Sequence, residues 1–363
     1  MADRRLRSPS ARAALLGAMH LLVDAACVTA VWRTGDSALV SFVNSFVVIF
    51  GYDLLAFATQ APLGALADRY ALSRASAFAG LALAALGLVL APHSSLLTML
   101  VAGLGNSLFH LGAGASVLRL GTLRATPAGL FVAPGALGLG LGNWMGMTGI
   151  GPAWPLVALL VLALPLVDLA RAEKAEEPGQ GRAVGLSAAA LGLSLLFFSV
   201  MVRSFVGFGA CHECERGTLL LVGIPVVGFA GKSLGGVLAD RLGWLKSSVG
   251  ALLLSAPLVA FNGGDAWVTL AGLLLFQMTM PVTLVATSCL LPGRPATAFG
   301  LPSLALILGA IPTFFPQCQR YSPGIFLVLI VASAAALYAA LRLVGPRGGA
   351  VLEDPSAPAV LRP

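Results

Sequence analysis

The chain has 363 residues, of which 58% are hydrophobic and only 10% are charged, and its mean hydropathy is +0.92. A water-soluble domain carries roughly 25% charged residues, so this chain cannot cover itself with a polar surface and is expected to lie in a lipid bilayer. The net charge of +7 does not indicate nucleic-acid binding, because the basic residues fall in short segments between apolar runs. The apolar run that begins near Ala13 is expected to be a first membrane helix rather than a cleavable signal peptide.

Apolar runs of about the length that spans a bilayer, roughly 20 residues, recur along the whole chain. Twelve of them follow one another, at 12–32, 38–67, 75–92, 95–118, 127–147, 153–170, 184–208, 217–239, 247–262, 266–290, 296–316 and 323–343. This pattern predicts an all-α membrane protein with about twelve transmembrane helices.

The longest polar segment, Arg171 to Arg182, separates six of these runs from the other six. The sequence therefore predicts a first six-helix bundle at 1–170, a cytoplasmic linker at 171–183, a second bundle at 184–345 and a flexible tail at 346–363. Of the lysines and arginines outside the predicted helix interiors, seventeen fall on the side of the N-terminus and three on the other side. By the positive-inside rule, both termini are expected in the cytoplasm, which fits a multi-pass protein of the cell (inner) membrane.

The two halves share a short motif. Gly64 is followed by Asp68 and Arg69 at the end of the second predicted helix, and Gly236 is followed by Asp240 and Arg241 at the end of the eighth. The glycines permit close approach of helices, and the Asp-Arg charges are expected to pair with neighbouring helix ends in one conformation only. We predict that these six residues take part in conformational gating. An ordinary cytoplasmic loop with a counter-charge is the alternative.

The repeated Gly-x-Leu-Ala-Asp-Arg motif, on a plan of six plus six helices, resembles the major facilitator superfamily. Three further segments resemble its fosmidomycin-resistance branch: His20-Leu-Leu-Val-Asp24, Gly103-Leu-Gly-Asn-Ser-Leu-Phe-His110, and Leu290-Leu-Pro-Gly-Arg294. Gln60, shortly before Pro62 and Gly64, also fits. The resemblance implies the major facilitator fold, with two six-helix pseudo-repeats around a central cavity, and a proton-coupled carrier of drugs or metabolites.

Ionisable residues at membrane depth cost roughly 2.5–3.5 kcal/mol each on insertion scales, so each one needs a reason. His20 and Asp24 are four residues apart and share one face of their helix, where they form a plausible proton site. Arg203 offers a planar fork to carboxylates or phosphonates and is expected to approach Asp24 across the cavity. His110 and Asp53 are the remaining candidates for solute and proton binding. For each residue a structural hydrogen bond or ion pair remains the alternative, and for Arg203 a position at the outer interface.

Two weaker patterns complete the candidates. Gly138, Gly142 and Gly146 form a small-residue ridge suited to close helix packing. The segment Cys211-His212-Glu213-Cys214 has metal-ligand residue types, but it is a single half-site, so no metal site is predicted there. The chain carries no phosphate-binding loop and no catalytic motif. We therefore expect no cofactor and no enzymatic activity.

The sequence favours a secondary active transporter, an antiporter that exports a drug or metabolite by alternating access with proton coupling. Its expected partners are a small solute, protons and the lipid bilayer, and it is expected to be a monomer. Two alternatives stay open: a proton-coupled uptake carrier, and a transporter-like receptor or scaffold without flux.

Overall fold

The computed structural model describes residues 8–34, 42–121, 123–151, 153–170, 185–211, 218–315 and 321–345. The predicted linker at 171–183, the tail at 346–363 and residues 212–214 of the cysteine-containing segment lie outside the described residues. Residues 8–170 are called the first half and residues 185–345 the second half.

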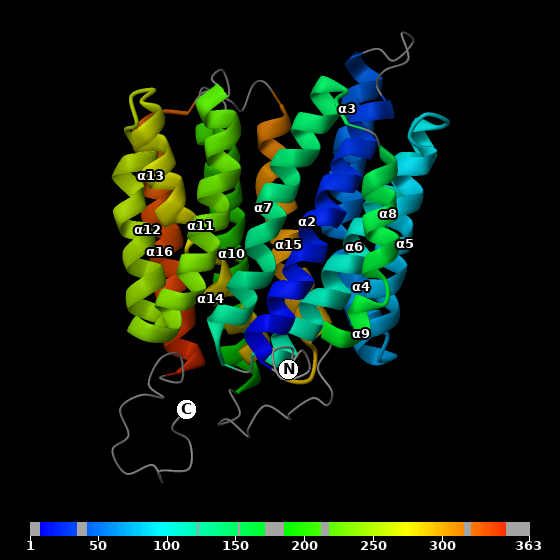
Figure 1. Cartoon of the computed structure of the whole chain (residues 1–363). Coiled ribbons are helices and arrows are strands. Elements are labelled where there is room, and N and C mark those ends of the chain that lie inside the picture. The colour runs from blue at the N-terminus through cyan, green and yellow to red at the C-terminus, as the bar shows by residue number, and fades with distance from the viewer. Residues whose placement is uncertain are drawn as a thin grey trace.

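The described part of the first half is built of helices joined by short turns (Figure 1). They are α2 (Pro9–Arg33), α3 (Phe42–Asp53), α4 (Gln60–Arg69), α5 (Ser73–Leu90), α6 (Ser95–Leu120), α7 (Ala125–Thr148), α8 (Ala153–Ala163) and α9 (Leu166–Ala170). A π-helical turn at Leu54–Ala58 lies between α3 and α4. α2 begins three residues before the predicted apolar run, because Pro9 suits the first helical turn and the Ser8 hydroxyl accepts a hydrogen bond from the Ala11 amide.

The second half repeats this plan. Its helices are α10 (Leu186–Cys211), α11 (Thr218–Leu242), α12 (Trp244–Ala260), α13 (Ala266–Gln277), α14 (Met280–Leu290), α15 (Pro295–Ala310) and α16 (Pro323–Val344), with a 3₁₀ turn at Ile311–Phe314. The described residues contain no strand. The all-α architecture predicted from the apolar runs is thereby confirmed.

Ten helical spans of the described residues are long and apolar enough to cross a membrane, and two shorter apolar helices, Ala153–Ala163 and Trp244–Ala260, occupy the remaining predicted runs. Several predicted runs are not continuous α-helices. The run at 153–170 divides into α8 and α9 around Pro165, which cannot donate a helical hydrogen bond. The run at 266–290 divides into α13 and α14 at Met278–Thr279.

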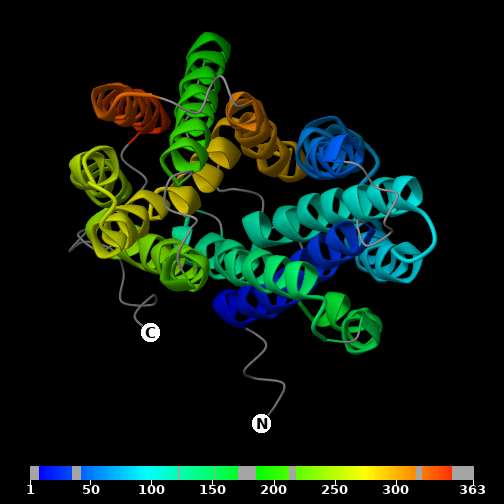
Figure 2. The ribbon, with the colours of Figure 1, turned by 90° about the horizontal axis from the view of Figure 1, so that it is seen from above.

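The helices run roughly alongside one another, and both the first and the last described helix have their free ends at the same end of the bundle (Figure 1). We call this end the terminal end. Seen from above, the blue-to-cyan helices of the first half lie on one side and the yellow-to-red helices of the second half lie on the other (Figure 2). The helices α7 and α11 pack against each other where the halves meet.

The small-residue ridge on α7 packs against α2, as its spacing predicted. Its glycines meet α2 at successive turns: Gly138 against Leu21 and Asp24, Gly142 against Ala25 and Val28, and Gly146 against Trp32. This close approach holds the backbone of α7 against the face of α2 that carries Asp24.

Replacing Gly138 with leucine is expected to lower the free energy of unfolding by about 1–3 kcal/mol, the usual cost of overpacking. A Cβ atom at position 138 would already lie 3.0 Å from the Asp24 Cβ. The apparent melting temperature of the purified protein in detergent measures the effect. The matched control is Gly250→Leu in α12, where a Cβ would meet no atom within 4 Å. Equal losses in both variants would contradict the packing role of the ridge.

Candidate functional site

A cluster of ionisable side chains is buried inside the first half. His20 and Asp24 come from α2 and His110 comes from α6, and their exposed fractions are 5%, 4% and 8%. The sequence predicts the first two as neighbours on one helix face, and the structure adds His110 to them. All three residues are among those predicted to bind solute or protons.

The cluster is held together by short contacts. The His20 Nε2 lies 3.1 Å from Asp24 Oδ2, and the His110 Nε2 lies 3.6 Å from Asp24 Oδ1. The amide of Asn106, one turn before His110, donates a 2.8 Å hydrogen bond to Asp24 Oδ1. The two histidine Nε2 atoms are 2.7 Å apart. Asp24 is therefore surrounded by groups that stabilise its negative charge.

The two imidazole rings are fixed by backbone carbonyls, which can only accept hydrogen bonds. The His20 Nδ1 lies 2.9 Å from the Phe131 oxygen, and the His110 Nδ1 lies 2.8 Å from the Asn106 oxygen. Both Nδ1 atoms must therefore carry hydrogen, and two neutral rings would present two lone pairs to each other at Nε2. A positive ion between the Nε2 atoms removes this repulsion and balances the Asp24 carboxylate. The simplest ion that could do so is a proton.

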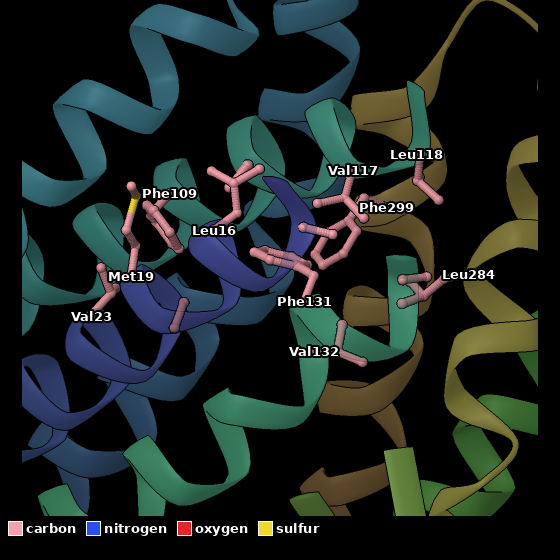
Figure 3. Close-up of a cluster of buried hydrophobic side chains, with 14 of the residues drawn as sticks. Leu16, Met19, Val23, Phe109, Val117, Leu118, Phe131, Val132, Leu284 and Phe299 are labelled. Carbon is pink, nitrogen blue, oxygen red and sulfur yellow. The ribbon is translucent and has the colours of Figure 1, made fainter. Parts of the chain in front are cut away.

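Aromatic side chains cover the cluster on the side of the second half. Phe131 of α7 packs on the His20 ring at a centroid distance of 4.9 Å, and Phe299 of α15 packs on Phe131 at 5.7 Å. Figure 3 shows Phe131 and Phe299 side by side among the buried apolar residues. Phe299 also lies 6.5 Å from the His110 ring. Phe131 belongs to the first half and Phe299 to the second, so both halves contribute to this cover.

Arg203 of α10 is buried rather than placed at the outer surface, with an exposed fraction of 7%. Its guanidinium donates hydrogen bonds to the hydroxyls of Thr279 and Thr283 and to the Ser199 carbonyl. The described carboxylates form no ion pair with it. The expected approach to Asp24 is therefore not present in this conformation, and no carboxylate among the described residues neutralises Arg203.

Two further ionisable residues lie near the centre of the bundle. Asp53 is the last residue of α3 and is only partly exposed, and it makes no hydrogen bond or ion pair within the described structure. Lys232 of α11, from the second half, lies close enough to interact electrostatically with Asp24 and His110. The structure thus separates Asp53 from the histidine cluster and brings Lys232 towards it.

The repeated motif forms contacts between the halves at the terminal end of the bundle. The Asp68 carboxylate, at the end of α4, accepts hydrogen bonds from the backbone amides of Ala296 and Thr297 at 3.0 and 2.8 Å. It also accepts one from the Thr297 hydroxyl at 2.8 Å. These groups form the first turn of α15, where free amides and the helix dipole favour a negative charge. We call this set the Asp68 contact.

The second copy of the motif makes the same contact in the opposite direction. Asp240, near the end of α11, accepts hydrogen bonds from the backbone amides of Ala125 and Thr126 at 2.7 and 2.8 Å, and from the Thr126 hydroxyl at 2.6 Å. These residues begin α7, so each half caps a helix of the other half. We call this set the Asp240 contact.

The other motif residues divide into two groups. Gly64 lies against the backbone of Ala296 and Gly236 against that of Ala125, so a Cβ atom at either glycine would collide with the capped helix. The arginines take no part in these contacts: Arg69 lies over the Tyr70 ring at 5.4 Å, and Arg241 is exposed. The glycines and aspartates of the predicted gate thus meet across the halves, while its arginines do not.

Sequence reasoning missed several residues on which the site depends. Asn106 and His110 stand four residues apart, so their shared helix face was a usable signal. Thr126 and Thr297 each lie in the first turn of a helix, two or three residues after an arginine, and this shared placement in the two halves was also a usable signal. The packing of Phe299 on Phe131 depends on how the halves meet and had no signal in the sequence.

The architecture resembles solved membrane transporters. No family model matches the chain, and no curated protein matches it. Among solved structures, the major facilitator superfamily transporter FucP in the outward conformation matches with a TM-score of 0.65 at 16% identity, covering 94% of this chain and 99% of that one. A variant of the E. coli fucose:proton symporter FucP matches with a TM-score of 0.63 at 16% identity, covering 92% of this chain and 98% of that one. The chain is therefore an all-α, multi-pass membrane protein with the major facilitator fold.

Proposed function

We propose that this protein is a secondary active transporter that moves a small solute by alternating access. The observation that carries the proposal is the reciprocal pair formed by the Asp68 and Asp240 contacts. Each contact joins a carboxylate of one half to the start of a helix in the other, through hydrogen bonds that can break and re-form. Breaking both would let the halves rock and open the terminal end around a site between them.

The buried cluster of His20, Asp24 and His110 supports coupling to protons. The two Nε2 atoms lie 2.7 Å apart, so one positive ion between them would remove the repulsion of their lone pairs, and Phe299 of the second half packs near His110. Rocking of the halves would remove that cover and expose the cluster to water. Arg203, and more distantly Asp53, would then contribute to the solute site. In this scheme protons move inward as a drug or metabolite moves out.

A second candidate is uptake by symport. It is favoured by the structural likeness to FucP, which is described as a fucose:proton symporter. The same proton site and the same reciprocal contacts would serve either direction, since the direction depends on which state binds the solute. A receptor or scaffold without flux would retain solute binding but would have no need for a cluster that exchanges ions.

The charge distribution supports a place in the cell (inner) membrane with both termini in the cytoplasm. In that orientation the Asp68 and Asp240 contacts close the cytoplasmic end. The reciprocal contacts lie within one chain, which supports a monomer as the functional unit. The proposed transport cycle uses neither a cofactor nor an enzymatic step.

Fosmidomycin is the first solute to test, because the segments around Asp24 and His110 resemble the fosmidomycin-resistance branch. Expression of the protein in a sensitive bacterial host is expected to raise the inhibitory concentration several-fold, and Asp24→Asn is expected to abolish the protection. The matched control is Asp265→Asn at matched membrane expression, since Asp265 caps α13 far from the cluster and asparagine caps equally well. Protection that persists in Asp24→Asn would remove Asp24 from the mechanism.

Removing the reciprocal contacts should open the terminal end. Spin labels at Leu66→Cys in α4 and Leu242→Cys in α11 report the separation, because both positions are exposed and belong to opposite halves. The double variant Asp68→Ala, Asp240→Ala is expected to shift the label-to-label distances to longer values, since hydrogen bonds to charged groups contribute roughly 1.5–3 kcal/mol each. Asp265→Ala serves as the control. Unchanged distances would contradict the gating role.

Orientation can be tested with a membrane-impermeant maleimide and single cysteines in a background without the native ones. His93→Cys, in the turn between α5 and α6, and Tyr70→Cys, after α4, lie at opposite ends of the bundle and are both exposed. His93→Cys is expected to react in intact cells and Tyr70→Cys only after lysis. The reverse pattern would invert the proposed topology.

A further inference from the structure

Three potential metal ligands converge on one point in the buried cluster. The ligand atoms of His20, Asp24 and His110 all lie within 4.8 Å of one another. A bridging proton joins only two atoms, whereas here both oxygens of Asp24 also approach the Nε2 atoms, at 3.1 and 3.6 Å. The geometry is that of three ligands around a common centre.

The surrounding hydrogen bonds prepare these atoms for coordination. Histidines that bind metals usually donate their second ring N–H to a carbonyl or carboxylate, which directs the remaining lone pair at the ion. Both rings do so here, through Nδ1 to the Phe131 and Asn106 carbonyls. The Asn106 amide orients the Asp24 carboxylate. Both lone pairs and one carboxylate are therefore fixed in direction before any ion arrives.

The backbone of α7 approaches the cluster closely at a glycine. A Cβ atom at Gly135 of α7 would lie 2.6 Å from His20 Cε1 and 2.8 Å from Asp24 Oδ2, so any side chain there would fill the coordination sphere. The Asn106 Oδ1 is buried nearby and has no hydrogen-bond partner within the described structure. A water molecule bound to an ion would supply the missing donor.

We propose that His20, Asp24 and His110 bind a divalent transition-metal ion such as Co²⁺, Ni²⁺ or Zn²⁺ in place of the proton between the Nε2 atoms. Imidazole and carboxylate are ligands that suit these ions. With metal–ligand distances of about 2.0–2.2 Å, neighbouring ligands of an octahedral or tetrahedral ion lie about 2.8–3.6 Å apart. The observed separations of 2.7, 3.1 and 3.6 Å lie around that range. The inference adds a second ion to the site of the proposed function and rests on that site.

The test is the binding of Co²⁺ to the purified, tag-free protein in detergent, followed by visible absorption and by equilibrium dialysis. We expect one ion per chain, with d–d bands typical of nitrogen and oxygen ligands. His20→Gln, His110→Gln and Gly135→Ala are expected to abolish binding, the last with every ligand still present. Asn106→Ala is expected to weaken it about 10–100-fold, as for other groups that orient ligands. Lys232→Met is expected to strengthen binding, because it removes a repelling charge.

Two controls separate this site from other donors on the chain. His93→Gln removes an exposed histidine and should leave binding unchanged. A triple variant, Cys211→Ser, His212→Gln and Cys214→Ser, should also bind Co²⁺ normally, whereas coordination by these cysteines would give a thiolate-to-cobalt charge-transfer band in the wild type.

Absence of binding in the wild type, or binding that survives loss of both buried histidines, would overturn the proposal. The wild-type spectrum decides the matter even where a variant fails to fold. Because the assay needs no flux, its failure is distinct from failure of the proposed transport, which the drug-protection and orientation tests address.

Discussion

Lipid offers no hydrogen-bond partners, so most polar groups inside this bundle are bound by other groups of the chain. That constraint accounts for the long helices, and also for what happens at their breaks and ends. Threonine and serine hydroxyls return to the helix backbone, as Thr283 does to the Thr279 carbonyl at 2.9 Å. Because each threonine hydroxyl donates its hydrogen to the backbone, its oxygen can accept a hydrogen bond from Arg203. The carboxylates of Asp24, Asp68 and Asp240 are each bound by several groups, and the proposed transport cycle assigns its changes of state to these three residues.

The two kinds of carboxylate are satisfied differently, and the difference separates their roles. Asp24 is bound by side chains of its own half, deep in the bundle. Asp68 and Asp240 are bound by backbone amides of the opposite half, at the terminal end. Rearranging the halves therefore breaks the second kind directly and affects the first only by removing its aromatic cover. The proposed proton-coupled carrier needs such a link between an ion site and a gate, and Phe299, which packs on Phe131 and lies near His110, is positioned to provide it.

Much of the architecture could be predicted from the sequence, because the apolar runs are long and each is bounded by charged or Pro/Gly residues. The pairing of His20 with Asp24 followed from their spacing on one helix. The meeting of His20 with His110 did not, since it depends on how α2 and α6 pack and on the side of each helix that faces the other. The hydroxyl partners of Arg203 could not be predicted either, because a threonine in an apolar run gives no indication of which neighbouring helix its side chain contacts.

The reciprocal caps have the form of an isologous interface, in which residue i of one unit contacts residue j of the other and j contacts i. Such contacts arise naturally between two copies of one six-helix unit related by a two-fold axis. A single favourable carboxylate in that ancestral unit would have produced both caps at once. Two such copies joined in one chain would be free to diverge, and here the first half carries two histidines around Asp24 while the second carries Arg203 and Lys232.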